Sequence, residues 1–376
     1  MITYGKCVMM KKMKFVDAHD KGILIHGRTD LTQELIPMFW TGAGVEFITD
    51  SSCVELVFEA DYAVREHWIR VTMDDATFIR MPLNKGRQRI SLYMGMPEGA
   101  PKRIRFYKEN QSTELDPSAI LLFAGIYCDG ELYPIEPRKR KLEVIGDSVS
   151  SGEGLMGPST LIGGLSACFS TENHYVLEMC RRLGADFRIM SQSGWGAAYG
   201  WNNMPSLAMP LYYREICSVR GSECFRRYGG EKENCFENWR PDVILVHLGN
   251  NDAFAMNEPA YTDPDTGKTY RMCFGEDGKV SGKSAEDITG AVYGFLKLLR
   301  ECNPNSRLVW IYGMFGTELE EAIRSGVDRF NEEKNDAEYI RIPTAAPEDY
   351  GSNNHPGQPA HLKLGEFLAD RLEGLF

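Results

Sequence analysis

The sequence lacks the marks of several large classes of protein. Lysines interrupt every short apolar run in the first 20 residues, so we expect neither a secretory signal nor a membrane span, and we expect the chain in the cytoplasm. Its ten cysteines include no C-x-x-C pair, and its seven histidines include no H-E-x-x-H sequence. We therefore expect free thiols, no metal and no cofactor. One group of neighbouring cysteines has spacings that match no familiar zinc pattern: Cys217, Cys224 and Cys235, with Cys273 downstream.

Basic side chains are in the minority. The chain has 42 Lys and Arg against 53 Asp and Glu, and this net charge of −11 disfavours nucleic acid or an anionic membrane as the main partner, because both would be repelled. Residues 1–140 carry 19 side chains of each sign, whereas residues 141–376 carry 23 basic and 34 acidic ones. The uneven distribution indicates two different units in a chain whose length suits two or three domains.

Short alternating runs fill the first part of the chain. From residue 22 to about 134, segments rich in Val, Ile, Phe and Tyr are separated by turn residues, with no helical periodicity between them. About eight such strands predict an all-β sandwich, of the jelly-roll type, over residues 1–138. The clearest strands are expected at Gly44–Ile48, Cys53–Glu59, His67–Met73, Thr77–Leu83, Gln88–Tyr93, Arg103–Tyr107 and Ala119–Cys128.

The pattern changes after residues 134–141, a proline-punctuated basic segment that is typical of an interdomain linker. Beyond it, fully apolar runs alternate with amphipathic ones, which predicts a doubly wound α/β domain with a parallel sheet over residues 139–376. Ligands of this architecture bind at the carboxyl ends of the strands. Strands are expected at Leu142–Ile145, Phe187–Met190, Val243–Leu248, Leu308–Tyr312 and Tyr339–Ile342, and helices at Glu172–Leu183, Ala285–Cys302, Glu318–Glu333 and Ala360–Leu372.

Polar turns follow several of these strands. The first strand leads into Gly146-Asp147-Ser148, the second into Ser193-Gly194, and the third into Gly249-Asn250-Asn251-Asp252. Together they would place a serine hydroxyl, backbone N–H groups and a carboxamide at one edge of the sheet, which is what acyl transfer requires. Each turn alone is ordinary.

A histidine follows the last strand. His355 lies in the loop after that strand, and His361 lies at the start of the closing helix. A loop histidine alone is more often a surface residue, but together with Ser148 it supplies the nucleophile and general base of a hydrolase.

These four blocks resemble the SGNH (GDSL-type) hydrolases, whose blocks contribute Ser, Gly, Asn and His in that order, here Ser148, Gly194, Asn251 and His355. The preceding sandwich, with its Phe39–Phe47 stretch and the junction before Ser148, looks like the N-terminal domain of carbohydrate esterase family 2. The resemblance implies a flavodoxin-like catalytic domain. It also implies a serine esterase that works through an acyl-enzyme, with an oxyanion hole made of the Ser148 N–H, the Gly194 N–H and the Asn251 side chain. Asp147 and Asp252 are expected to fix turns.

One departure from the family pattern concerns the base. The family usually places an Asp two or three residues before the catalytic histidine, where this chain has Ser352 and Asn353. We therefore predict a Ser–His dyad in which a backbone carbonyl or Ser352 holds His355. Asp349 or Glu348 would complete a triad if the loop folds back.

The long connection between the second and third strands is rich in aromatic residues. We expect Trp195 and Trp201 to bind substrate, although packing within the insertion explains these residues equally well. The family resemblance implies removal of O-acetyl groups from xylo-, manno- or gluco-configured saccharides, often at the 6-position. Acetylated oligosaccharides are the expected partner, and the sequence leaves the oligomeric state open.

Other functions compete with this interpretation. Gly152-Glu153-Gly154-Leu155-Met156-Gly157 formally matches the G-x-G-x-x-G of dinucleotide-binding oxidoreductases, but it does not lie directly between a strand and a helix as that motif requires. A zinc hydrolase is disfavoured by the dispersed histidines. A non-catalytic carbohydrate-binding protein and a GDSL-type esterase or lipase for non-sugar esters remain open alternatives.

Overall fold

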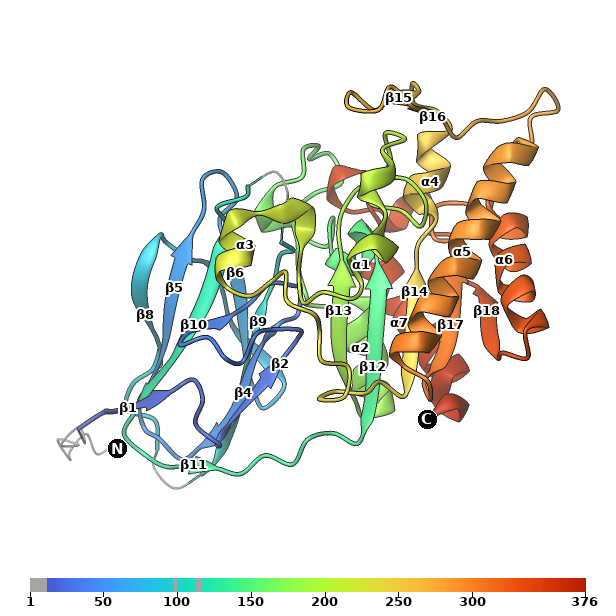
Figure 1. Cartoon of the computed structure of the whole chain (residues 1–376). Coiled ribbons are helices and arrows are strands. Elements are labelled where there is room, and N and C mark those ends of the chain that lie inside the picture. Colours follow the sequence, from blue (N-terminus) through green and yellow to red (C-terminus); the bar gives the residue numbers. More distant parts are fainter. Residues whose placement is uncertain (1–11, 98–99, 113–115) are drawn as a thin grey trace.

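The structure is a computed structural model that describes residues 12–97, 100–112 and 116–376. Two antiparallel sheets stand beside one parallel sheet (Figure 1). The first antiparallel sheet has the order β1-β10-β5-β8, with β3 paired to β10, and the second has the order β11-β4-β9-β6-β7, with β2 paired to β4. These strands are β1 (Lys14–Asp17), β2 (Ile23–His26), β3 (Ile36–Pro37), β4 (Gly44–Thr49), β5 (Val54–Asp61), β6 (Trp68–Met73), β7 (Ala76–Pro82), β8 (Gly86–Tyr93), β9 (Lys102–Lys108), β10 (Ile120–Cys128) and β11 (Leu132–Tyr133).

The two antiparallel sheets enclose one apolar core. Phe58 of one sheet meets Phe106 of the other edge to face, with ring centroids 5.0 Å apart, and Phe123 lies 5.7 Å from Phe58. All three rings are fully buried. Each of the seven strands expected in this part of the chain is present, because alternating apolar side chains fill the space between the sheets.

The parallel sheet has the order β13-β12-β14-β17-β18, which is 2-1-3-4-5 in chain order, as in flavodoxin-like sheets. Every residue of β14 is buried because both faces of the sheet are covered. The point at which the strand order reverses lies at β12, so a ligand is expected at the carboxyl end of that strand. The strands are β12 (Arg140–Gly146), β13 (Ala185–Ser191), β14 (Val243–His247), β17 (Arg307–Tyr312) and β18 (Ala337–Arg341).

Four longer helices cover the two faces of this sheet. Helices α2 (Tyr175–Leu183) and α7 (Gln358–Leu372) pack on one face, and α5 (Gly282–Cys302) and α6 (Glu320–Glu332) pack on the other. Helix α2 begins later than the expected Glu172 because Asn173 has a left-handed backbone with φ of 56°.

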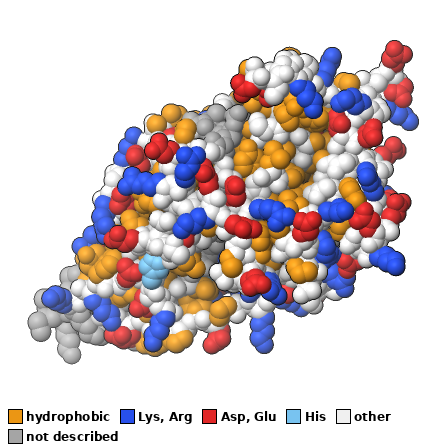
Figure 2. All heavy atoms as spheres, in the orientation of Figure 1, with side chains coloured by type: hydrophobic (Ala, Val, Ile, Leu, Met, Phe, Trp, Pro, Cys, Tyr) orange, Lys and Arg blue, Asp and Glu red, His pale blue; other side chains and the backbone are white. Residues whose placement is uncertain are grey.

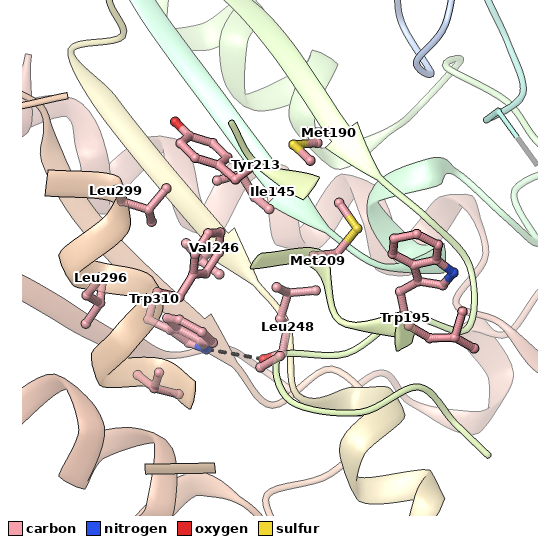
Figure 3. Packing of buried hydrophobic residues seen from close by; sticks show 14 of the residues in the cluster. Ile145, Met190, Trp195, Met209, Tyr213, Val246, Leu248, Leu296, Leu299 and Trp310 are labelled. Atoms are coloured by element: carbon pink, nitrogen blue, oxygen red, sulfur yellow. Dashed lines mark hydrogen bonds between the residues drawn. The ribbon is translucent and has the colours of Figure 1, made fainter. Parts of the chain in front are cut away.

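The core under α5 is large and contains aromatic rings. In the close view of Figure 3, Val246 and Trp310 of the sheet face Leu296 and Leu299 of α5, and the Trp310 indole N–H donates to Leu248 O at 3.2 Å. The same cluster continues into the connection between β13 and β14, which includes Trp195, Met209 and Tyr213.

The two parts of the molecule are joined by buried polar contacts. Arg28 is 1% exposed, and it donates to Glu143 Oε1 at 3.1 Å and to Tyr213 O at 2.6 Å. The Trp40 indole N–H donates to Ile216 O at 2.8 Å. The sandwich is therefore fastened to the parallel sheet through groups that water does not reach.

The segment after β9 is a second junction. Glu109 is fully buried; it accepts hydrogen bonds from Ser170 Oγ at 2.8 Å and from the Thr171 N–H at 2.7 Å. Arg80 neutralises it at 2.7 Å. Two residues later, Gln111 extends from this segment toward the parallel sheet.

Short elements complete the fold. The helices are α1 (Ser148–Ser151), α3 (Glu223–Arg227) and α4 (Asn250–Ala255); the hairpin β15 (Tyr261–Thr262) and β16 (Thr269–Tyr270) projects beyond α4 (Figure 1). The 3-10 turns are η1 (Ser166–Cys168), η2 (Pro205–Leu207), η3 (Met209–Tyr212), η4 (Val219–Gly221), η5 (Pro347–Asp349), η6 (Ser352–Asn354) and η7 (Glu373–Leu375). Figure 2 shows acidic and basic side chains mixed over one face, with hydrophobic side chains gathered toward its upper part. In the described ranges, none of the helices combines the length and the hydrophobicity that spanning a bilayer requires.

Candidate active site

The serine of the first block lies in a tight strand-to-helix turn. Strand β12 ends at Gly146, and Asp147 caps α1 by accepting the Val149 N–H at 3.1 Å, so that the helix begins at Ser148. A side chain at Gly146 would collide with Ser150, because its Cβ would lie 2.0 Å from Ser150 Oγ. The turn places the Ser148 hydroxyl at the carboxyl end of the sheet, at the start of a helix.

The histidine of the last block reaches this serine. His355 Nε2 lies 2.8 Å from Ser148 Oγ, and His355 Nδ1 lies 2.7 Å from the main-chain oxygen of Asn353. Asn353 and Asn354 both have left-handed backbones, with φ of 53° and 55°, and this double turn aims the Asn353 carbonyl back at the ring. Ser148, His355 and the Asn353 carbonyl are therefore connected in series as the nucleophile, the base and the group that orients the base.

The G-x-G-x-x-G sequence brings these two loops together. A Cβ on Gly154 would lie 2.4 Å from His355 Cβ, and a Cβ on Gly351 would lie 1.9 Å from Gly154 O. The Ser352 N–H donates to Gly154 O at 3.2 Å. The glycine at position 154 thus allows two backbones to touch, which explains this feature of the sequence without a dinucleotide.

Two further turns supply hydrogen-bond donors beside Ser148. Gly194 has a left-handed φ of 80°, and Asn251 lies in the first turn of α4 and donates from Nδ2 to Trp195 O at 2.8 Å. In the described part of the chain, the N–H groups of Ser148 and Gly194 donate to no protein acceptor. Since both residues and Asn251 line the same cavity, these donors are available to an oxygen bound there.

Two buried carboxylates fix the turns. Asp252 accepts the N–H groups of Ala197, Ala198 and Tyr199 at 2.7 to 2.8 Å, and Asp147 accepts Asn250 Nδ2 at 2.8 Å. Burial raises the pKa of Asp147 to about 6, although its hydrogen bonds oppose the shift. Burial also raises the pKa of Asp252, against the effect of the three N–H groups.

Aromatic side chains wall the cavity above the dyad, which has a volume of about 700 Å³. Trp201 and Phe254, 47% and 46% exposed, stand at its opening. Phe315 contacts the His355 ring edge to face, with centroids 5.8 Å apart, and packs on Phe254 at 5.4 Å. A cavity with aromatic walls and a polar floor suits a ligand that has both apolar faces and hydroxyl groups.

A polar network lines the floor. Glu153 accepts hydrogen bonds from Ser193 Oγ at 2.5 Å and from Asn353 Nδ2 at 2.6 Å. Gln111 Oε1, which comes from the sandwich, accepts the Ser193 N–H at 2.8 Å. The network joins the loops that carry Gly194 and His355.

Comparisons with known proteins agree with this geometry. No family model matches the sequence. The structure superimposes on that of the acetyl xylan esterase Est2A from the rumen bacterium Butyrivibrio proteoclasticus with a TM-score of 0.94 and 33% identity, over 97% of this chain and 99% of that one. The solved structure of a family two carbohydrate esterase from Clostridium thermocellum matches with a TM-score of 0.76 and 18% identity, over 94% of this chain and all of that one.

The chain belongs to carbohydrate esterase family 2. Both solved structures are of proteins named as esterases. Two curated relatives are similar over shorter regions: the cellulase/esterase CelE of Acetivibrio thermocellus, 24% identical over 63% of this chain, and the acetylxylan esterase/glucomannan deacetylase of Cellvibrio japonicus, 28% identical over 36%. The matched regions are 27% and 37% of these two proteins.

For this family 2 member, the structure brings most of the predicted site together. Ser148, Gly194, Trp201, Asn251 and His355 all line one cavity. Asp147 and Asp252 fix turns, although Asp252 does so on a segment more than 50 residues away in the chain rather than locally.

The prediction for Trp195 was wrong. Its side chain is fully buried, packs against Tyr212 with ring centroids 4.8 Å apart, and does not line the cavity. Tyr199 and Tyr213 are buried in the same core. Of the two tryptophans expected to bind substrate, Trp201 lines the cavity, whereas Trp195 helps to fill the interior of the insertion.

The alternative triad carboxylates lie elsewhere. Asp349 forms an ion pair with Lys363 at 2.5 Å, and Glu348 is exposed, so neither holds His355. The Ser352 hydroxyl donates to Met156 O at 2.7 Å instead of to the ring. His361 is fully buried, and burial lowers its pKa well below the usual value.

Several residues of the cavity were missed in the sequence, and four of them contact the dyad or its supporting loops or stand beside them. Phe254 follows Asn251 by three positions on α4, and Phe315 follows the end of β17; the rules applied to the other strand ends would have found both. Glu153 lay within the glycine sequence considered only for nucleotides. Gln111 carries no signal, because only the packing of the sandwich on the parallel sheet brings it to the cavity.

Proposed function

We propose that the chain is a serine esterase that removes O-acetyl groups from saccharides, with Ser148 as nucleophile and His355 as general base. The observation that carries the proposal is the 2.8 Å contact between Ser148 Oγ and His355 Nε2 in a cavity that Gly194 and Asn251 also line. The Asn353 carbonyl, 2.7 Å from Nδ1, holds the ring so that Nε2 is free to accept a proton.

The reaction follows from this geometry. Ser148 Oγ attacks the acetyl carbonyl carbon and passes its proton to His355 Nε2, and the N–H groups of Ser148 and Gly194 and the Asn251 Nδ2 stabilise the oxyanion. The bond to the sugar oxygen then breaks, and His355 returns the proton to that oxygen. Water attacks the acetyl-Ser148 ester with the help of His355, which releases acetate and restores the serine hydroxyl.

Labelling tests the nucleophile. A fluorophosphonate should modify the wild-type chain at Ser148 and leave Ser148→Ala unmodified. On acetylated xylo- and manno-oligosaccharides, Ser148→Ala and His355→Gln should each lose about 10⁴-fold or more in kcat. A wild-type chain that takes up no label and releases no acetate would instead be a carbohydrate-binding protein.

The saccharide is supported by the walls of the cavity and by the relatives. The names of Est2A and of the Cellvibrio japonicus relative both specify acetylated xylan. An exposed indole such as that of Trp201 offers a flat face to a sugar ring. Trp201→Ala should raise KM for acetylated oligosaccharides about 5- to 30-fold, equivalent to about 1–2 kcal/mol, and leave 4-nitrophenyl acetate nearly unaffected.

A matched control for Trp201 is Leu211→Ala, an exposed apolar residue of the same insertion that lies outside the cavity. Equal losses on both substrates would point to an esterase for small non-sugar esters.

We further propose a jelly-roll topology for residues 1–138 and a catalytic domain over 139–376. Cytoplasmic residence also stays a prediction, to be tested by fractionation of cells that express the tagged chain.

A further inference from the structure

A carboxylate that this reaction does not use lies beside the dyad. Glu153 is 5% exposed, and its Oε2 lies 3.8 Å from His355 Nε2, the atom that faces Ser148. In the described part of the chain, His355 is the one basic side chain within ion-pair distance of Glu153, and the two carry opposite charges once His355 has accepted a proton. Because leaving water is costly for a charged group, buried carboxylates in proteins are usually paired with a cation or held by hydrogen bonds.

The position of this carboxylate is fixed on both sides. Oε2 accepts Ser193 Oγ at 2.5 Å, and Oε1 accepts Asn353 Nδ2 at 2.6 Å. The backbone at Gly152 and Gly154, with φ of 78° and 84°, turns the chain so that Glu153 enters the floor of the cavity directly after α1. The carboxylate is therefore held in place and not free to move toward solvent.

We propose that Glu153 is a positioning residue that compensates for the carboxylate absent before His355. The inference rests on the proposed function, because it concerns the charge that His355 acquires during ester cleavage. When Ser148 passes its proton to Nε2, the ring becomes cationic, and the Asn353 carbonyl at Nδ1 carries no full charge to balance it. The Glu153 carboxylate takes no part in the proton transfer, and it lowers the energy of the cationic ring across a short path that water screens weakly.

Glu153 acts on the ring by a second route. Its hydrogen bond to the Asn353 side chain holds the residue whose main-chain oxygen orients His355. Gly163 donates its N–H to Asn353 Oδ1 at 2.9 Å, which completes the support. Glu153 thus stabilises the cationic His355 ring directly and orients it indirectly, through Asn353.

Among the described residues, two other titratable groups act on His355. Asp147 and His361 interact with it electrostatically through the packing behind α1. Both are fully buried, and among the described residues the side-chain hydrogen bonds and ion pairs of Glu153 are to Ser193, Asn353 and His355 instead. They are unchanged in variants at position 153, so differences among those variants report on the Glu153 carboxylate.

The test removes the negative charge at position 153 and keeps a hydrogen bond to each neighbour of that side chain. In Glu153→Gln, Oε1 still accepts Asn353 Nδ2, and the new amide can donate to Ser193 Oγ, which is itself able to donate to Gln111. We expect kcat for 4-nitrophenyl acetate to fall about 10- to 100-fold with KM changed less than about twofold. The acidic limb of the kcat/KM profile should move to lower pH by about one unit, because the cationic ring loses its stabilising neighbour.

Three variants serve as comparisons. Glu348→Gln makes the same chemical change at an exposed site seven residues before His355, and it should leave both the rate and the profile as in the wild type. Glu153→Asp keeps the charge and should restore most of the acidic limb even if the rate is reduced by a longer distance. Asn353→Gly keeps the left-handed backbone and removes the side-chain hydrogen bonds to Glu153 and Gly163, so it should lower kcat with little movement of the limb.

A measurement without turnover separates this inference from the proposed function. In chains labelled with ¹³C-histidine and carrying Ser148→Ala, we expect the NMR titration midpoint of the His355 ring to fall by about one pH unit when Glu153→Gln is added. An unmoved midpoint, or a Glu153→Gln enzyme with wild-type kcat and profile, would overturn the role of Glu153. If the midpoint moves but the wild-type chain cleaves no ester, the coupling stands and the esterase proposal fails.

Discussion

His355 takes its orientation from a main-chain oxygen. The Asn353 carbonyl at 2.7 Å occupies the place where a carboxylate would be expected in a triad. A carbonyl accepts the Nδ1–H bond and fixes the tautomer, but it offers only a partial charge. The residue that sets the geometry and the residue that balances the charge are therefore different in this site.

Asn251 offers the first prediction at this scale. Asn251→Ala removes one oxyanion donor while the N–H donors of Ser148 and Gly194 remain, so kcat should fall about 10²- to 10³-fold with little change in KM. Acetate release under saturating substrate measures the effect. Asn238→Ala, at an exposed position, is the matched control. A rise in KM with unchanged kcat would mean that Asn251 binds the ground state and does not stabilise the oxyanion.

At the scale of elements, periodicity predicts the long pieces and misses the short ones. The five parallel strands and the helices α2, α5, α6 and α7 all follow from apolar spacing, with ends displaced by a few residues. Helices α1 and α4 have four and six residues, too few for a periodic signal, and they begin at polar turns. These two short helices carry Ser148 and Asn251, so the sequence predicted the residues of the site better than the elements that hold them.

Asp252 ties one such element to another. It accepts three N–H groups of residues 197–199, next to the turn that carries Gly194. Asp252→Ala leaves these buried donors without an acceptor and should lower the free energy of unfolding by about 3 kcal/mol or more. Urea unfolding measures this, with Asp328→Ala on the exposed side of α6 as control. Equal midpoints for the two variants would show that the turn is held by other contacts.

At the scale of the whole molecule, the sequence indicated two units but not how they are joined. Arg28 and Glu109 lie among ordinary residues of the sandwich, and nothing in their spacing shows that each is buried against the parallel sheet. Such contacts join residues more than 60 positions apart, and periodicity reports only on near neighbours. Gln111 could not be predicted as a cavity residue for the same reason, because its contact with Ser193 joins residues 82 positions apart.

Arg28 tests the strength of that junction. Arg28→Ala leaves Glu143 buried without its cation and should lower the free energy of unfolding by about 3–5 kcal/mol. Lys232→Ala breaks the ion pair between the exposed Lys232 and Asp30. It should lower the free energy of unfolding by less than about 1 kcal/mol. Chemical denaturation of both variants gives the comparison. Similar small losses would mean that the junction depends on its apolar contacts.

Four buried histidines make the stability of the whole fold depend on pH. Burial lowers the pKa of His67, His174 and His247 to about 3, and that of His361 well below its usual value. These rings stay neutral in the folded chain but bind protons in the unfolded chain below about pH 6.5. Stability is thus fully present above that pH and falls toward pH 5, by up to about 1.4 kcal/mol per pH unit for each ring. Asp147, with its raised pKa, acts in the opposite direction over part of this range.

His247 allows this dependence to be measured one ring at a time. Neither ring nitrogen of His247 has a hydrogen-bond partner among the described residues, so His247→Leu removes a titrating group without breaking a bond. Between pH 6.5 and 5, the free energy of unfolding of the variant should fall less steeply than that of the wild type. The difference in slope should correspond to about one proton bound on unfolding. Urea midpoints across this range give the slopes. His19→Gln, on the surface, should follow the wild type, and an unchanged slope for His247→Leu would assign the dependence to other groups.

Gln111 has a consequence for how this protein can be recombined. The exposed connection at residues 134–139 is an inviting place to join the sheet domain to a different sandwich. Such a chimera would keep Ser148, Asn251 and His355, yet it would lose the oxygen that accepts the Ser193 N–H next to Gly194. The two halves are therefore not interchangeable modules, and any exchange at that joint must carry over the segment after β9 together with the sheet domain that it completes.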